Sequence, residues 1–263
     1  MSFVDVRRDG AVVVISLNRP AKLNALSTAM LEDLTEAVRR HDGPPAERML
    51  VFEGRGERAF CAGSDLADVQ AGESALARHE AALSGLIGAL SSAAAMKVAL
   101  LHGQVRGGGT VFPSLVDLVL AADDLQLSLP EIHFGMYQVV LHALLLEKLP
   151  EALVWQLAAT GRVLGARESL ELGIAAEVLP ADDFRLGAGE RVRFYADRLG
   201  ALALGRRMRS ISSGAGVPER VAAAVPLMMQ NHSLPGVKDR IERYAQAIAA
   251  KNPAKRGTGG DGS

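Results

Sequence analysis

The sequence contains a single cysteine, Cys61, which excludes a disulfide within one chain and a zinc site built on cysteines. Aromatic residues make up only 4%, and the 29 basic residues are balanced by 30 acidic ones, which disfavours a nucleic-acid or anionic-membrane partner. No apolar run reaches the roughly 18 residues that span a bilayer, and the first residues lack the apolar centre of a secretory signal. We therefore expect a cytoplasmic protein without a membrane partner.

The composition is otherwise that of a folded domain. Hydrophobic residues make up 49% of 263 residues, enough to bury a large core. The length suits one large domain, or one domain with an appended helical part. The last stretch, residues 253–263, is polar and rich in glycine, and we expect it to be a flexible tail.

The N-terminal region shows clear local signals. Asp9 and Gly10 separate two strand-like runs, VDVRRD and AVVVISL, which predicts a β-hairpin. Ser27 precedes a segment in which apolar residues recur at helical spacing, and it is a plausible helix N-cap.

Further along, strands alternate with helices. The segments RMLVFEG and KVALL are typical of buried strands, and helical patterns follow each of them. After the glycines at 107–109 we expect a helix that runs through Val116 and Leu120. From about Leu141 onward the pattern is helix after helix. This alternation predicts an α/β fold with a mostly parallel sheet.

Two glycine-bearing loops, FCAGSDL and RGGGT, each follow a buried strand and precede a helix. Such loops line the crevice where parallel strands end, and two of them can aim two backbone N–H groups at one oxygen. The alternative is that the glycines only permit tight packing. A phosphate loop would need Lys-Ser or Lys-Thr after the glycines, and the chain has Thr110-Val111 there.

Five segments in this order resemble the enoyl-CoA hydratase/isomerase (crotonase) superfamily: ISLNRPAKLNALS, AFCAGSDL, HGQVRGGG, LPEIHFG and TGRVLGARESLELGIAAEVLP. The resemblance implies a crotonase-like fold, in which repeated ββα turns form two roughly perpendicular sheets. It also divides the chain into a core domain over 1–195, which holds the CoA and acyl site, and a C-terminal helical trimerisation region over 196–252. The assembly that it implies is a homotrimer or hexamer.

The resemblance also assigns roles to residues. It implies that the thioester oxygen of an acyl-CoA is held by the backbone N–H groups of Ser64 and Gly108. No metal or permanently bound cofactor is implied, because coenzyme A arrives as part of the substrate. Contacts to the substrate and its CoA map to Lys22, Leu23, Ala25, Ala62, Gly63, Asp65, Leu66 and Gly107. From the residues alone, we interpret Asp65 as a residue at the start of a helix that satisfies backbone donors there. Lys22 is then a charged residue on the surface, and Cys61 is a buried small hydrophobe.

One carboxylate of the hydratase pair is absent. Hydratases of the family carry a glutamate two residues after the triple glycine, and this chain has Val111 there. The second glutamate of the pair is present as Glu131. A valine can neither hold nor activate water, whereas a single glutamate beside an oxyanion hole suits isomerisation of 3-enoyl-CoA to 2-enoyl-CoA. We therefore expect this isomerisation in preference to hydration.

Other chemistries stay open. The polar candidates for the pocket wall are Arg106, Tyr137, Gln138, His133 and His142, beside the bulky Val139 and Val140. Tyr137 lies near the position where some decarboxylases of the superfamily place a tyrosine. Another reaction through an enolate, thioester hydrolysis, residual hydratase activity, or binding of an acyl-CoA without catalysis are the alternatives.

Overall fold

In the computed structural model of the chain, residues 3–203, 206, 222, 229 and 237–251 are described. The larger of two sheets has the strand order β1-β2-β3-β5-β7-β10. Its strands are β1 (Val4–Asp9), β2 (Val12–Leu17), β3 (Met49–Gly54), β5 (Met96–Leu101), β7 (Leu118–Ala122) and β10 (Glu177–Leu179). Only the β1–β2 pair is antiparallel, and every other neighbouring pair is parallel. The predicted α/β class and mostly parallel sheet are therefore confirmed.

The second sheet is smaller and has the order β4-β6-β8-β9. Its strands are β4 (Ala59–Cys61), β6 (Gln104–Arg106), β8 (Gln126–Ser128) and β9 (Leu164–Gly165). The pairs β4–β6 and β6–β8 are parallel, and β9 pairs antiparallel with β8. Both glycine loops start where strands of this sheet end, so the sheet sets their spacing.

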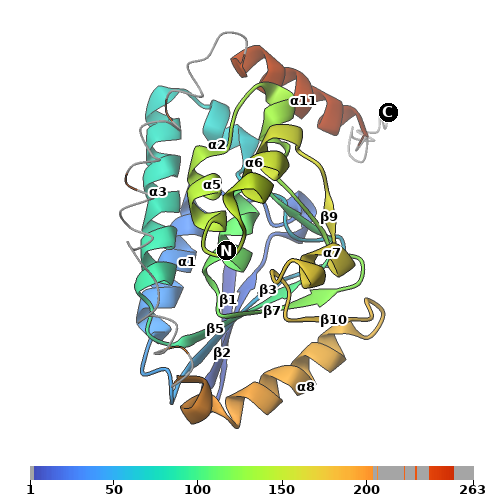
Figure 1. Ribbon diagram of the computed structural model, residues 1–263. Helices are drawn as coiled ribbons and strands as arrows, with labels where there is room; N and C mark the ends of the chain where they lie inside the picture. The colour runs from blue at the N-terminus through green and yellow to red at the C-terminus, as the bar shows by residue number, and fades with distance from the viewer. Residues whose placement is uncertain (1–2, 204–205, 207–221, 223–228, 230–236, 252–263) are drawn as a thin grey trace, which may run out of the picture.

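Helices connect the strands and cover the larger sheet (Figure 1). They are α1 (Thr28–His41), α2 (Leu66–Gln70), α3 (Glu73–Ser92), α4 (Val111–Leu115), α5 (Val139–Leu145), α6 (Glu151–Thr160), α7 (Ala166–Glu171), α8 (Phe184–Ala196) and α11 (Val237–Lys251). The described residues also form the short 3-10 helices η1 (Pro20–Lys22), η2 (Gly107–Thr110) and η3 (Pro130–Phe134). No helix in the described part of the chain is long and apolar enough to cross a membrane.

The two faces of the larger sheet are buried against different helices. Along β2, Val13 and Ile15 point into the main core, which also holds the inner faces of α1 and α3. Val14, between them, points to the opposite face and packs with Phe184 and Val192 of α8. Because strand side chains alternate, a sheet that is covered on both sides needs apolar residues at consecutive positions, as the run VVVISL provides.

The predicted hairpin and helix cap are both confirmed. β1 and β2 pair so that Asp9 lies opposite Val12, and Gly10 in the turn has φ +57. Ser27 is the N-cap of α1, and its hydroxyl accepts a hydrogen bond from the Met30 N–H at 3.3 Å. Both signals are local, which explains why they could be read from the sequence.

The predicted helix through Val116 and Leu120 is wrong. The helix after the glycines is only α4, which ends at Leu115, and its C-cap Val116 has an extended backbone with φ −84 and ψ 160. Residues 118–122 form β7, which lies between β5 and β10 in the larger sheet. A central parallel strand is buried on both faces, so its continuous apolar run looks the same as a buried helix.

The C-terminal helix α11 packs against η3 and α2 of its own chain. Ile241 of α11 is buried with Phe134 and Met136, and Leu66 of α2 packs against this cluster. The ring of Tyr244 lies 4.3 Å from that of Phe134, centroid to centroid. Residues 253–263, predicted as a tail, and much of the region 196–252 lie outside the described residues, so the division into domains stays a prediction.

Candidate active site

The first glycine loop, residues 62–65, is fixed by backbone pairing with residues 23–26. Ala62 N–H donates to the Leu23 carbonyl at 2.9 Å, and Leu26 N–H donates to the Gly63 carbonyl at 2.8 Å. The Asp65 N–H donates to the Leu26 carbonyl at 2.8 Å. Leu26 and Ser64 are thereby paired in an isolated β-bridge. The predicted CoA-contact residues before and after β4 are therefore side by side.

Asp65 has a structural role at the end of this loop. It is the N-cap of α2, where its carboxylate accepts a hydrogen bond from the Ala67 N–H at 3.0 Å. The same carboxylate forms an ion pair with Arg19. The interpretation of Asp65 as a residue that satisfies backbone donors at a helix start is confirmed. Sequence reasoning missed Arg19.

Asn24 is a second residue that sequence reasoning missed. Its fully buried side chain accepts a hydrogen bond from the Arg19 N–H at 2.9 Å. Its amide nitrogen donates to the carbonyls of Arg55 at 2.9 Å and Ala59 at 3.0 Å. The backbone of Asn24 has φ +55, a region that asparagine tolerates better than most residues. This one side chain therefore ties the loop at 19–26 to both ends of the 55–59 turn.

The second glycine loop forms η2, and a protein group lies against each of its three glycines. A Cβ on Gly107 would overlap Oε1 of Glu131, and Gly107 has φ +46. A Cβ on Gly108 would lie 3.2 Å from Ser64 Oγ and 3.5 Å from Ser64 N. A Cβ on Gly109 would lie 2.8 Å from the Cys61 carbonyl oxygen. The run of glycines is required because the first loop and Glu131 approach the backbone here.

Ser64 and Gly108 therefore stand on facing loops. A Cβ on Gly63 would lie 3.7 Å from Gly108 N, which places the two loops in contact from the other side as well. Gly108 is in the first turn of η2, where N–H groups have no partner within the helix. This closeness is what an oxyanion hole built from two backbone N–H groups requires.

Glu131 brings a carboxyl group to these loops. It lies in the first turn of η3, and Oε2 is buried without a hydrogen-bond partner in the described structure. Burial raises the pKa of Glu131 to about 7, while its own backbone N–H and the Gln138 side chain act in the opposite direction. A carboxyl with this pKa can both accept and return a proton near neutral pH.

Val111 offers no chemistry at the second carboxylate position. It is fully buried and packs in the main hydrophobic core with residues such as Leu26 and Phe112. Cys61 is also fully buried, and burial raises the pKa of its thiol to about 12. The expectation that Cys61 is a buried small hydrophobe is confirmed.

The other predicted pocket residues are engaged elsewhere. The Arg106 guanidinium donates to Gln104 Oε1 at 3.1 Å and to Ser128 Oγ at 2.9 Å. The Tyr137 hydroxyl lies 2.7 Å from His142 Nδ1, and its ring centroid lies 5.2 Å from that of Trp155. Of the remainder, His133 and Lys22 are exposed, Val139 is half-buried, and Val140 is buried in the main core.

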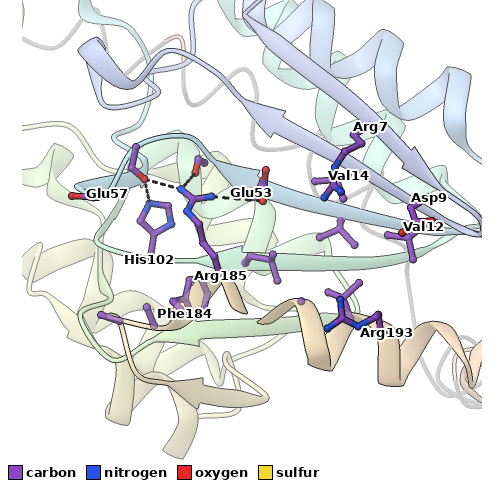
Figure 2. Close-up of a pocket in the computed structure, with 18 of the residues that line it drawn as sticks. Arg7, Asp9, Val12, Val14, Glu53, Glu57, His102, Phe184, Arg185 and Arg193 are labelled. Carbon is purple, nitrogen blue, oxygen red and sulfur yellow. Dashed lines mark hydrogen bonds and ion pairs between the residues drawn. The ribbon is translucent and has the colours of Figure 1, made fainter. Parts of the chain in front are cut away.

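A separate pocket of about 240 Å³ lies between the larger sheet and α8 (Figure 2). Its floor is apolar, with Val14 among the strand residues, and Arg185 reaches across it from α8. Arg185 donates to the Gly56 carbonyl at 3.0 Å and lies 3.8 Å from Glu53, while His102 Nε2 lies 3.0 Å from the same carbonyl. None of the residues at the two glycine loops lines this pocket, so it is distinct from the candidate active site.

Comparison with known proteins identifies the family. The enoyl-CoA hydratase/isomerase family matches residues 7–200. A carnitinyl-CoA dehydratase of Proteus mirabilis is 32% identical over 182 residues, which cover 69% of each chain. A probable enoyl-CoA hydratase of Mycobacterium tuberculosis is 31% identical over 182 residues, 68% of this chain and 69% of the relative.

A solved structure confirms the fold independently of close sequence similarity. The enoyl-CoA hydratase from Bacillus halodurans superposes with a TM-score of 0.81 at 19% identity, over 92% of this chain and 100% of that one. The chain belongs to the enoyl-CoA hydratase/isomerase family and has the crotonase fold. The family acts on coenzyme A thioesters.

Proposed function

We propose that the protein isomerises 3-enoyl-CoA to 2-enoyl-CoA, with Glu131 as the acid and base. The observation that carries this proposal is the single carboxyl at the glycine loops: Glu131 lies against Gly107, and position 111 is a buried valine. Hydration needs a group that activates water as well as one that delivers a proton. Isomerisation needs only one group that moves a proton between two carbons.

The proposed reaction has two proton transfers. Glu131 takes a proton from C2 of the substrate, and the electron pair delocalises over the double bond and the thioester carbonyl. The N–H groups of Ser64 and Gly108 stabilise the negative charge that develops on the thioester oxygen. The protonated Glu131 then returns the proton to C4, which leaves the double bond conjugated with the thioester. No other reactant is consumed.

The CoA part of the substrate would bind along the paired segments 22–25 and 62–66. Lys22 is exposed and free of the core, as a residue that meets phosphate groups must be. Leu23, Ala25, Ala62 and Leu66 are half-buried, which leaves apolar surface for the pantetheine chain. The Asp65 carboxylate is occupied by Arg19 and the start of α2, so we propose that it supports the loop rather than the ligand.

Hydration of 2-enoyl-CoA, or its reverse, is the second candidate, because the two relatives named above are a dehydratase and a probable hydratase. The buried Val111 argues against it. Decarboxylation is less well supported, because Tyr137 is paired with His142 and Arg106 with Gln104 and Ser128. The buried carboxyl of Glu131 would have no purpose in a binder without catalysis. We propose a homotrimer or hexamer as the assembly, which light scattering after size-exclusion chromatography would test.

The test is a paired assay with short and medium 3-enoyl-CoA and 2-enoyl-CoA, followed by the ultraviolet absorbance of the conjugated thioester. The proposal predicts that absorbance rises with the 3-enoyl substrates and does not fall with the 2-enoyl substrates. Loss of absorbance with the 2-enoyl substrates would support hydration instead. No change with either would overturn both candidates.

A further inference from the structure

Helix α8 contributes a row of three residues to the pocket that it forms with the larger sheet: Arg185, Gly189 and Arg193. These residues are spaced four apart, so they lie on one face of the helix and span about 12 Å along its axis. Gly189 lies inside α8, where glycine is about 1 kcal/mol less favourable than alanine. A Cβ on Gly189 would meet nothing closer than the Arg193 guanidinium, at 4.0 Å. The glycine is therefore not required by packing, and it leaves an open space between the two arginines.

Opposite this space, the sheet supplies an apolar floor. Val14 of β2, Val51 of β3, Leu100 of β5 and Ala122 of β7 all line the pocket and belong to the same hydrophobic cluster. The pocket measures about 240 Å³. A dry cavity of about 150 Å³ is enough to hold benzene. The pocket therefore has room for a short aliphatic chain, which would lie on the floor beneath Gly189.

One end of the pocket carries free positive charge. Arg7 of β1 lies opposite Val14 in the strand register, so its side chain is on the face of the sheet that α8 covers. Figure 2 shows Arg7 and Arg193 at this end, Arg7 on the sheet and Arg193 on the helix. Neither makes an ion pair or a hydrogen bond with another described residue. Asp9 lies at the same end, and the two arginines exceed it by one positive charge.

The other end of the pocket is unfavourable for an anion. Arg185 donates to two backbone carbonyls of the turn after β3 and lies 3.8 Å from Glu53. Glu57 and Asp124 also line the pocket and add negative charge. His102 is buried, and burial lowers its pKa below the ordinary value of 6.5, so it is neutral near pH 7. An anionic group is therefore directed to the end that holds Arg7 and Arg193.

We propose that this pocket is a binding site for a short aliphatic carboxylate. The carboxylate lies between the guanidinium groups of Arg7 and Arg193, which have the planar donor geometry that a carboxylate accepts. The chain lies on the apolar floor, in the space that Gly189 leaves open. The proposal is independent of the proposed function, because none of the residues at the two glycine loops lines this pocket.

The first test is a titration with hexanoate, followed by nuclear magnetic resonance of isotope-labelled valine and leucine methyl groups. We expect the methyl resonances of Val14, Val51 and Leu100 to shift. Hexanoate should bind more tightly than 1-hexanol, which lacks the charge, and than hexylammonium, which carries the opposite charge. Absence of these shifts would overturn the proposal, as would binding of either of the other two compounds at least as tightly as hexanoate.

Filling the space beside Gly189 tests the location of the chain. Gly189→Leu should abolish the binding of hexanoate, because the leucine side chain occupies the place of the ligand chain. Gly189→Ala adds one methyl group at van der Waals distance from Arg193 and should still bind. Both residues favour a helix more than glycine does, so both variants should fold. Unchanged binding by Gly189→Leu would overturn the proposal.

The arginines and the glycine loops are tested separately. Arg7→Gln and Arg193→Gln should each weaken hexanoate binding about threefold to tenfold. The control is Arg78→Gln on α3, because Arg78 is exposed and does not line the pocket. Glu131→Gln should bind hexanoate as the wild type does. Equal binding by the three arginine variants would overturn the proposal, and so would binding that is lost in Glu131→Gln but kept in Gly189→Leu.

Discussion

Gly107 and Glu131 are in direct contact, because Oε1 of Glu131 occupies the space that a side chain on residue 107 would need. Gly107→Ala would therefore displace the carboxyl group, and it would also strain a backbone with φ +46. We expect kcat to fall about 10²-fold, the scale for a misplacement of about 1 Å. Gly165→Ala is the matched control, because Gly165 has φ −79 and nothing lies within 4 Å of its added Cβ. Equal activity of the two variants would contradict the placement of Glu131.

The pH dependence of the reaction should report the raised pKa of Glu131. Burial raises this pKa to about 7, and the carboxyl must be ionised to take a proton from the substrate. The value of kcat/KM should therefore be constant above about pH 7 and fall tenfold per pH unit below it. A profile that stays level down to about pH 4.5, the ordinary range for glutamate, would show that the pKa of the base is not raised by burial.

Glu80 should make folding stability depend on pH. It lies on the inner face of α3, where burial raises its pKa from 4.5 to about 7. The folded protein therefore holds this proton more tightly than the unfolded chain. The penalty for burying the charge is absent below about pH 4.5, grows as the pH rises, and is complete above about pH 7. This difference corresponds to roughly 3 kcal/mol.

Glu80→Gln removes the titration and so isolates this effect. We expect the unfolding free energy of the variant, relative to the wild type, to rise by up to about 3 kcal/mol between pH 4.5 and pH 8. Urea unfolding at several pH values measures it. Glu36→Gln is the control, because the Glu36 side chain on α1 is 73% exposed. A constant difference across this range would show that Glu80 is not buried as the structure has it.

Asn24 should contribute to stability more than its place in a loop suggests. Asn24→Ala would leave the carbonyls of Arg55 and Ala59 and the N–H of Arg19 without their partner. We expect a loss of about 2–4 kcal/mol, because unsatisfied buried groups cost about 1–3 kcal/mol each. The half-buried Asn18, which donates to Asp5 at 2.9 Å in an exposed hydrogen bond, offers Asn18→Ala as the control. Equal melting temperatures for the two variants would contradict the role of Asn24.

The sequence predicted the features that depend on neighbours along the chain and on the family motifs. The hairpin at Gly10, the cap at Ser27 and the two glycine loops are local patterns. The strand at 118–122 was predicted as a helix, because a strand buried on both faces has no alternation that distinguishes it. The contact of Gly107 with Glu131 and the ion pair of Arg19 with Asp65 depend on how distant segments pack, which no local pattern contains.

The central claim is that one carboxyl group removes the proton from C2 and delivers it to C4. The most direct measurement is nuclear magnetic resonance of a 3-enoyl-CoA incubated with the protein in deuterated water. The account predicts that the wild type forms the 2-enoyl product, with deuterium at C4 when the proton on Glu131 exchanges with solvent. Glu131→Gln should form it about 10²–10⁴-fold more slowly. Product formation at the wild-type rate by Glu131→Gln would contradict the account.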